Sequence, residues 1–175
     1  VNLTVLRVDT SNPVSISEFA EKINDPIDVL INNAGILIEE RFPDVTEEGM
    51  LLSFKVNTMG PYMLIQECFK LNKLKDGAKI VNISSILGSI TNTGGTTSVP
   101  YSISKAALNM VTKLMAHKLK NMYVISMHPG WVKTDMGGEN APILPEDSAS
   151  GIISIIRMLN KTGVFLDYQG NTIEW

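Results

Sequence analysis

Two patterns of apolar residues alternate along this chain. Short unbroken apolar runs are typical of buried strands, and apolar residues that recur every three or four positions are typical of amphipathic helices. Their alternation predicts a parallel sheet with helices packed on its faces, an α/β fold. The strands are expected at residues 3–8, 27–31, 79–83, 123–127 and 164–166, and the helices at 15–23, 46–69, 101–119 and 145–159.

Local signals refine the long helix expected at 46–69. Thr46 is suited to cap its N-terminus, and Glu47 and Glu48 place negative charge in the first turn, where the helix dipole favours it. Gly60-Pro61 lies inside the same pattern, and proline has no amide hydrogen to donate. We therefore expect a kink at this pair rather than the end of the helix.

The composition narrows the class of protein. The chain has 175 residues, of which 44% are hydrophobic, and this size predicts a single domain over residues 1–175. The net charge is −3, and no basic stripe indicates a nucleic-acid partner. The sequence has no run of 18 apolar residues, and residues 1–8 lack the features of a signal peptide. We expect neither a nucleic-acid partner nor a membrane partner.

The cysteine count bears on the compartment. Cys68 is the single cysteine, so an internal disulfide is excluded and a reducing compartment is expected, which favours a cytoplasmic protein. Because no pattern places a base beside it, we interpret Cys68 as an unreactive helix residue rather than a reactive thiol.

Tyr101 and Lys105 are the most informative pair. They are four residues apart, so on the helix expected at 101–119 they lie on one face, one turn apart. An ammonium one turn from a phenol favours the phenolate and is expected to lower the pKa of Tyr101 towards the range useful for acid–base chemistry. Alone this spacing is common, and a solvated helix face is the alternative interpretation.

Ser84 and Ser85 follow the strand expected at 79–83. Loops at the carboxyl ends of parallel strands are where α/β proteins bind ligands. A serine at this place can donate a hydrogen bond to a substrate carbonyl and stabilise the charge that develops on its oxygen. Both serines are candidates for this role. The alternative for each is a turn residue that bonds only the backbone.

Other segments carry further candidates. Asn33-Ala34-Gly35 ends the strand expected at 27–31 with small residues, which let a flat ring or a ribose approach the backbone. Asn57 lies in the long helix before the expected kink, and a polar residue on the helix surface is its alternative. Asp9 follows the first expected strand, where an aspartate is also ordinary turn chemistry. The strand expected at 123–127 runs into the segment His128-Pro-Gly-Trp-Val-Lys-Thr-Asp-Met-Gly-Gly138.

The order of these motifs resembles the short-chain dehydrogenase/reductase family. The run 128–142 is similar to the branch of sniffer-type carbonyl reductases and C-factor-like proteins. The resemblance covers almost the whole chain and implies a Rossmann-like doubly wound parallel sheet. It further implies an NAD(P)(H)-dependent oxidoreductase that moves hydride between the nicotinamide and a small ketone, aldehyde or alcohol. NADPH is expected rather than NADH, with carbonyl reduction as the reaction and a homodimer or homotetramer built on helices 46–69 and 101–119.

The resemblance also implies a role for each candidate residue. Tyr101 protonates the substrate oxygen, Ser85 rather than Ser84 polarises it, and Lys105 tunes Tyr101 and holds the ribose. Asn57 bends the helix and holds a water that leads to Lys105. The implied cofactor contacts are Asp9 at the adenine; Asn33, Ala34 and Gly35 at the adenosine half; Tyr101 and Lys105; Pro129, Gly130 and Val132 at the nicotinamide; and Thr134 at the amide or pyrophosphate.

No metal site is expected. His117 and His128 have no partner at the spacing of metal ligands, so both are interpreted as structural.

Two features depart from the family pattern. No Gly-rich turn stands between an expected strand and a helix, so the chain corresponds to the family fold without its first β-α-β-α elements, and the segment 3–8 then has no neighbouring strand. We interpret the sequence as a fragment or the ordered part of a longer chain, with a truncated protein as the alternative. The stretch between Ser85 and Tyr101 is also longer than is commonest in the family.

Three hypotheses for the function follow. The complete set of Asn57, Ser85, Tyr101 and Lys105 favours a catalytic reductase. The C-factor resemblance leaves open a non-catalytic NAD(P)-binding or signalling module, and the departures leave open an inactive fragment.

Overall fold

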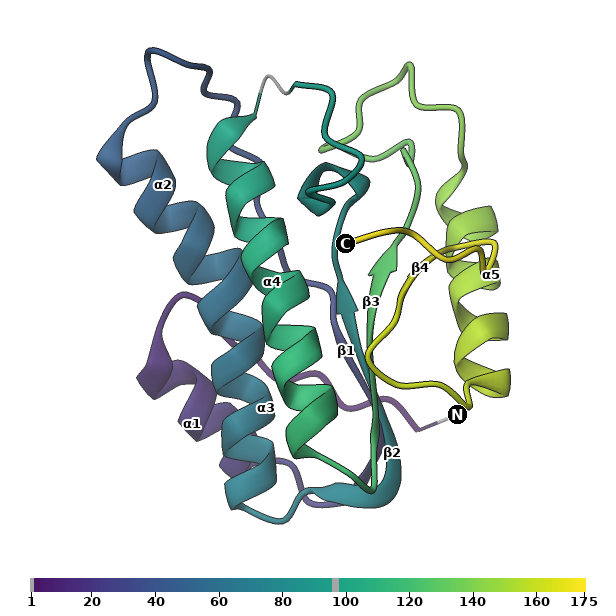
Figure 1. The fold of residues 1–175 in the computed structure, drawn as a ribbon. Helices are drawn as coiled ribbons and strands as arrows, with labels where there is room; N and C mark the ends of the chain where they lie inside the picture. The colour runs from purple at the N-terminus through teal and green to yellow at the C-terminus, as the bar shows by residue number, and fades with distance from the viewer. Residues whose placement is uncertain (1, 96–97) are drawn as a thin grey trace.

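The strands of this chain form one parallel sheet. The computed structural model describes residues 2–95 and 98–175. Neighbouring strands are also consecutive in the sequence, and all three pairings are parallel (Figure 1). The strands are β1 (Ile27–Asn32), β2 (Leu74–Ile83), β3 (Tyr123–His128) and β4 (Phe165–Asp167).

Helices cover both faces of the sheet, which confirms the predicted Rossmann-like α/β fold (Figure 1). Successive residues of a strand point to opposite faces. In β2, Ile80 therefore packs with Ile65 and Ala116 on one face, while Val81 packs with Ile156 on the other. The helices are α1 (Pro13–Glu21), α2 (Glu47–Phe54), α3 (Gly60–Lys70), α4 (Val99–Lys118) and α5 (Pro145–Met158).

The helix α1 packs on α3 rather than directly on the centre of the sheet. Ile16 and Ala20 of α1 are buried against Leu64 and Cys68 of α3. Burial raises the pKa of the Cys68 thiol to about 11. The interpretation of Cys68 as an unreactive helix residue is confirmed, because a protonated and fully buried thiol is not a nucleophile.

The long helix predicted at 46–69 forms with one irregular turn. Thr46 caps it, and its hydroxyl accepts a hydrogen bond from the Gly49 amide at 3.0 Å. Between α2 and α3 the chain makes a π-helical turn, η1 (Lys55–Met59), which ends at Gly60-Pro61. The break therefore lies just before the expected kink, since Pro61 has no amide to bond the carbonyl one turn back. Isolated π turns occur often at functional sites, and this one carries Asn57.

The strand predicted at residues 3–8 is wrong. Residues 2–9 form no helix or strand, and the side chains of Leu3 and Val5 are 84% and 82% exposed. No strand of the described residues lies beside this segment in the sheet. An extended segment without a neighbouring strand has no ladder to satisfy its amide and carbonyl groups, so its apolar pattern alone does not produce a strand.

Candidate active site

A cleft of about 940 Å³ lies where β1, β2 and β3 end. Its volume lies in the range of sites for small molecules and cofactors. The segments that follow the three strands line it, and α4 contributes Tyr101 and Lys105. Because parallel strands end at the same edge of the sheet, residues more than 90 positions apart converge there.

Tyr101 and Lys105 lie on one face of α4, as their spacing predicts. Both line the cleft, although Tyr101 is only 9% exposed and Lys105 only 3%. The Lys105 ammonium lies 5.5 Å from the centre of the Tyr101 ring. Its Nζ donates a hydrogen bond to the Ile83 carbonyl oxygen at 2.7 Å, which uses one of the three donors of an ammonium. This bond ties the helix residue to the end of β2.

The expected direction of the Tyr101 pKa is wrong. Burial raises the pKa of Tyr101, and a hydrogen bond with Ser85 opposes this only in part. Burial also lowers the pKa of Lys105, to about 8. The sequence argument counted the ammonium but not the loss of water around both groups, which here has the larger effect. Tyr101 is consequently held as a protonated phenol at neutral pH.

The two serines after β2 have different partners. The Ser84 hydroxyl donates to Asn109 Oδ1 at 2.7 Å and is buried. Ser85 begins a short 3-10 turn, η2 (Ile86–Gly88), where its Oγ accepts from the Leu87 amide at 3.2 Å. It also shares the hydrogen bond with Tyr101. Of the two candidates, Ser85 is therefore the serine placed beside the phenol.

Asn57 is not a surface residue, so the alternative interpretation of it is wrong. Its side chain is fully buried in η1. Its Oδ1 accepts from the Ile36 amide and its Nδ2 donates to the Ile36 carbonyl, both at 2.9 Å, and Nδ2 also donates to Ser104 Oγ at 3.0 Å. Asn57 thereby joins the loop after β1 to α4.

The expected cofactor contacts divide into two groups. The loops after β1 and β3 bring Asn33, Ala34, Gly35, Pro129, Gly130, Val132 and Thr134 to the cleft beside Tyr101 and Lys105. Asp9 is not among the lining residues. Its Oδ1 accepts hydrogen bonds from the amide and the hydroxyl of Ser11 at 2.9 and 2.7 Å, and these bonds lower the pKa of the exposed carboxyl. Asp9 thus closes a turn before α1.

His128 and Ser148 also line the cleft, although the sequence did not lead us to expect either of them there. His128, interpreted from the sequence as structural, faces the cleft, and its Nδ1 accepts a hydrogen bond from the Ile86 amide at 3.3 Å. Burial lowers its pKa, which favours the neutral ring that such a bond requires. Ser148 of α5 donates to the Pro129 carbonyl at 2.6 Å. The position of His128 directly before Pro129-Gly130 could have indicated that it lies at the cleft. Nothing local in the sequence connects Ser148 with the loop after β3.

The backbone that lines the cleft requires glycine at two positions. Gly130 has φ +84°, and a Cβ there would overlap Ile143 and contact Tyr168. A Cβ on Gly35 would lie 3.2 Å from Asn57 Oδ1 and 3.5 Å from Lys105 Nζ. Glycine at position 35 therefore leaves space beside the lysine, and glycine at position 130 permits the positive φ and the close packing on Ile143.

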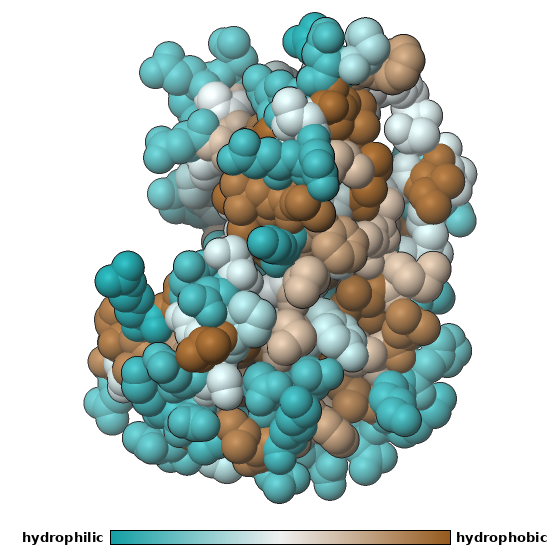
Figure 2. Space-filling view, turned by 90° about the vertical axis from the view of Figure 1, so that its left-hand side faces the viewer, coloured by the Kyte–Doolittle hydropathy of each residue, from teal (hydrophilic) through white to brown (hydrophobic). Residues whose placement is uncertain are grey.

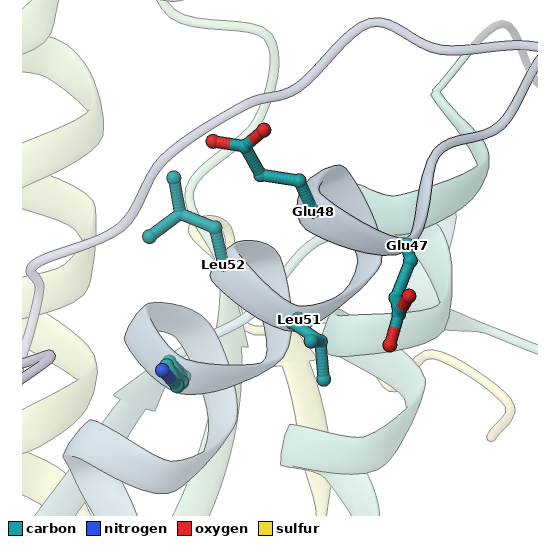
Figure 3. A pocket seen from close by; sticks show the side chains of 5 residues that line it. Glu47, Glu48, Leu51 and Leu52 are labelled. Carbon is teal, nitrogen blue, oxygen red and sulfur yellow. The ribbon is translucent and has the colours of Figure 1, made fainter.

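A shallow hollow on α2 lacks the convergence seen in the cleft. Its volume is about 440 Å³, and it is lined by Glu47, Glu48, Leu51, Leu52 and Lys55 (Figure 3). All of these residues come from one helical segment, so the hollow is the outer surface of a helix rather than a site built by several elements.

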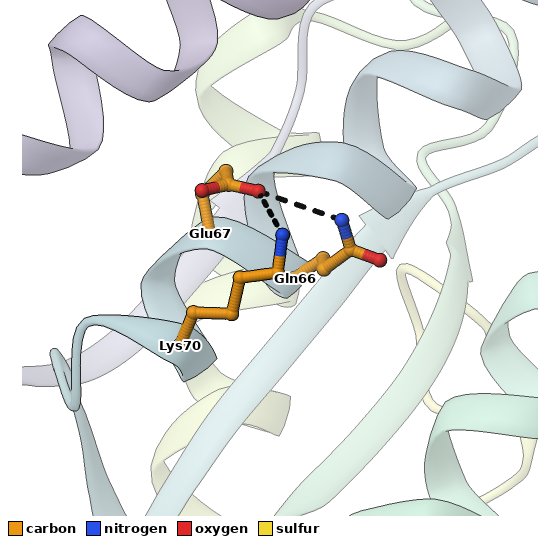
Figure 4. A network of polar contacts seen from close by, with 3 residues as sticks. All are labelled: Gln66, Glu67 and Lys70. Carbon is orange, nitrogen blue, oxygen red and sulfur yellow. Dashed lines mark hydrogen bonds and ion pairs between the residues drawn. The ribbon is translucent and has the colours of Figure 1, made fainter.

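The polar cluster on α3 is also local. Lys70 Nζ lies 2.8 Å from Glu67 Oε1, and Gln66 Nε2 donates to the same oxygen at 3.4 Å (Figure 4). The hydrogen bond from Lys70 lowers the pKa of Glu67. Lysine and glutamate one turn apart are an ordinary helix-stabilising pair. Across residues 2–95 and 98–175, no group of three or more histidine, cysteine, aspartate or glutamate side chains is placed to hold a metal ion. No helix in the same ranges has the length and apolar character to cross a membrane.

Comparison with known proteins identifies the class of this site. The family model of short chain dehydrogenases matches residues 1–143. The C-signal protein of Myxococcus xanthus is 38% identical over 158 residues, which are 86% of this chain and 93% of that protein. The 1-hydroxy-2-glutathionyl-2-methyl-3-butene dehydrogenase of Rhodococcus sp. is 29% identical over 179 residues, which are 96% of this chain and 78% of that enzyme.

Solved structures give the same result at the level of the fold. An NADPH-bound carbonyl reductase from chicken fatty liver superposes with a TM-score of 0.93 at 30% identity, over 99% of this chain and 78% of that one. The carbonyl reductase Sniffer of D. melanogaster superposes with a TM-score of 0.90 at 34% identity, over 97% of this chain and 77% of that one. The similarity to sniffer-type reductases and to C-signal confirms the resemblance inferred from the motifs.

Proposed function

Because this chain belongs to the short-chain dehydrogenase family, whose members are NAD(P)-dependent oxidoreductases, we propose that it reduces the carbonyl group of a small ketone or aldehyde with NADPH. The observation that carries this proposal is the convergence of Ser85, from the turn after β2, with Tyr101 and Lys105, from α4, on one cleft. The similarity to the NADPH-bound chicken enzyme supports NADPH as the cofactor. Residues 1–175 then form a single reductase domain.

The cleft suits a flat ring and a ribose. Gly35 leaves space beside Asn57 and Lys105, and the positive φ of Gly130 turns the backbone after β3 along the cleft. Lys105 has donors beyond the one used by Ile83, and these suit ribose hydroxyl groups. When bound, the nicotinamide supplies the hydride. Asn33, Ala34, Pro129, Val132 and Thr134 are proposed to complete its binding site. Asp9 lies in a turn outside this cleft. Its proposed contact with the adenine therefore requires the cofactor to extend beyond the cleft to that turn.

The reaction needs a proton donor and a group that stabilises the carbonyl oxygen. Tyr101 is held as a neutral phenol, which is the form that can donate a proton to the oxygen. Ser85 donates a hydrogen bond to the same oxygen as charge develops on it. Lys105 carries a positive charge beside the phenol and stabilises the phenolate that remains. Asn57 orients the loop after β1 at the cleft and is proposed to hold a water that returns a proton through Lys105.

A second candidate function is binding without turnover. The observation behind this candidate is the similarity to the C-signal protein, which is 38% identical over 93% of its length. It predicts tight NADPH binding by the purified protein and no reduction of a panel of aldehydes, ketones and quinones.

An assembly of two or four copies is proposed as well. Leu52, Met110 and Leu114 lie on the outer faces of α2 and α4 and are largely exposed, whereas Met50 is half-buried. Figure 2 shows the molecule from the side of α1 and α2, where apolar patches are interrupted by polar side chains. Exposed apolar surface of this kind supports burial against a second copy. The free, buried Cys68 supports a reducing compartment such as the cytoplasm.

The variant Tyr101→Phe tests the proposed reaction. It removes only the hydroxyl group, so carbonyl reduction is expected to fall by about 10²–10⁴-fold while the Kd of NADPH stays nearly the same. Tyr62→Phe, at a partly exposed position of α3 outside the cleft, is the matched control and keeps full activity. A Tyr101→Phe enzyme that retained more than about a tenth of the rate would show that Tyr101 is not the acid.

A further inference from the structure

One side chain of α4 holds both ends of the turn that carries Ser85. Asn109 lies one helical turn after Lys105, on the same face of α4, and is 4% exposed. Its Oδ1 accepts the hydrogen bond from Ser84 Oγ at 2.7 Å. Its Nδ2 donates to the Gly88 carbonyl oxygen at 3.1 Å. A single amide thus binds the first and the last residue of the segment 84–88.

The same segment also lies in direct contact with the backbone of α4. A Cβ on Gly88 would lie 2.6 Å from the carbonyl carbon of Lys105 and 2.8 Å from its Cβ. Ser84 Oγ lies 3.4 Å from the Lys105 carbonyl oxygen. The close contact at Gly88 sets how near the turn comes to the helix, and the two bonds to Asn109 set where it lies along the helix.

We propose that Asn109 is a positioning residue that fixes Ser85 relative to Tyr101 by holding the turn 84–88 on α4. This inference rests on the proposed function of Ser85 and Tyr101. An amide is suited to the task because it accepts and donates at once. Its partners are buried, so water does not replace a lost bond. Catalytic groups tolerate little displacement, since an error of about 1 Å costs about 10²-fold in rate.

The inference also assigns a role to Ser84. Its hydroxyl is bound to Asn109, whereas the hydrogen-bond partner of Tyr101 is Ser85. Ser84 therefore serves as the anchor of the turn, and Ser85 as the group that meets the substrate oxygen.

The variant Asn109→Leu tests the inference, because leucine has a similar volume and no polar atoms. We expect kcat for NADPH-dependent carbonyl reduction to fall by about 10–100-fold while KM changes by less than about threefold. Thr112→Val is the matched control: Thr112 is fully buried on the same helix, and its hydroxyl is bonded to Asn82 and Ser126 instead of the turn. Its loss lowers stability through broken buried bonds but leaves kcat within about twofold.

A double-mutant cycle separates the anchor from the catalytic serine. Ser84→Ala breaks the same contact more mildly, so it also serves if Asn109→Leu does not fold. Because both substitutions act through one bond, Ser84→Ala is expected to lower kcat in the wild type but to have little further effect in the Asn109→Leu protein. If the two losses multiply in full, Ser84 acts on the substrate itself and the inference is overturned.

Hydrogen exchange provides a readout that needs no turnover. The Gly88 and Ser89 amides donate to Ser85 and Ile86 within the turn. Asn109→Leu is expected to accelerate exchange in residues 84–92, whereas Thr112→Val leaves this segment unchanged. A wild-type protein that reduces no carbonyl compound would refute the proposed function alone. Equal exchange of residues 84–92 in wild type and Asn109→Leu would refute the positioning role.

Discussion

Replacement of Lys105 by methionine is expected to abolish the activity. It is also expected to remove a pH-dependent destabilisation of the folded protein. Lys105 is almost completely buried, and burial lowers the pKa of its ammonium from 10.5 to about 8. At pH 7 the group still carries its charge, so the folded protein holds a cation that the surroundings disfavour. Methionine is similar in length, uncharged and flexible enough to occupy the same space.

The magnitude follows from the difference between the two pKa values. A shift from 10.5 to about 8 corresponds to about 3 kcal/mol, at about 1.4 kcal/mol for each pH unit. Between these pH values the unfolded chain binds the proton and the folded chain does not, so the stability of the wild type rises with pH. The cost is complete below pH 8 and absent above pH 10.5. At pH 7 its removal is offset by loss of the bond to the Ile83 carbonyl, worth about 1.5–3 kcal/mol.

Urea unfolding of the two proteins, followed by tryptophan fluorescence at several pH values from 7 to 10, measures this difference. The wild type should gain most of about 3 kcal/mol over this range relative to Lys105→Met. Lys70→Met, at a lysine with a 57% exposed side chain, controls for the loss of one positive charge. If the free energies of unfolding of wild type and Lys105→Met changed with pH in parallel, the reasoning would be refuted. A buried ammonium with a lowered pKa must make the difference between them depend on pH.

Two further predictions concern packing and assembly. Gly88→Ala is expected to lower stability by about 1–3 kcal/mol and to reduce turnover, because its Cβ would overlap the backbone of Lys105. Gly94→Ala is the control, since its Cβ would meet no atom within 4 Å, and an equal effect of both would contradict this account. Light scattering at micromolar concentration should give the mass of a dimer or tetramer for the wild type and a smaller mass for Leu114→Glu, whereas a wild-type monomer would contradict the proposed assembly.

Much of the fold follows from local patterns in the sequence. The strands β1 and β3 begin at the predicted residues because each is a short, largely apolar run of the length of a strand. The cap at Thr46 and the start of α4 near Pro100 follow from chemistry confined to one helical turn. Tyr101 and Lys105 share a face because helical geometry alone places residues four apart on the same side.

The interpretations that proved wrong concern properties that depend on residues distant in the sequence. The apolar pattern at residues 3–8 satisfies the rule for a strand, yet a strand also needs a partner for its backbone, and none of the described strands provides one. For Asn57, the interpretation that fails is the alternative of a surface residue, which rested on its polarity alone. Its burial arises because the loop after β1 and the helix α4 meet over it.

The same distinction applies to the chemistry of the site. The sequence determines which functional groups are present, but it does not determine their protonation or their hydrogen-bond partners. The pKa of Tyr101 rises because packing removes water from the phenol, and the sequence contains no measure of that loss. Ser84 and Ser85 have the same local chemistry, and only the family resemblance favoured Ser85 at the level of the sequence. In the structure, the bond of Ser84 to Asn109, 25 positions away, distinguishes it from the serine beside Tyr101. Local geometry is set by neighbours along the chain, whereas desolvation and hydrogen-bond partners are set by neighbours in space.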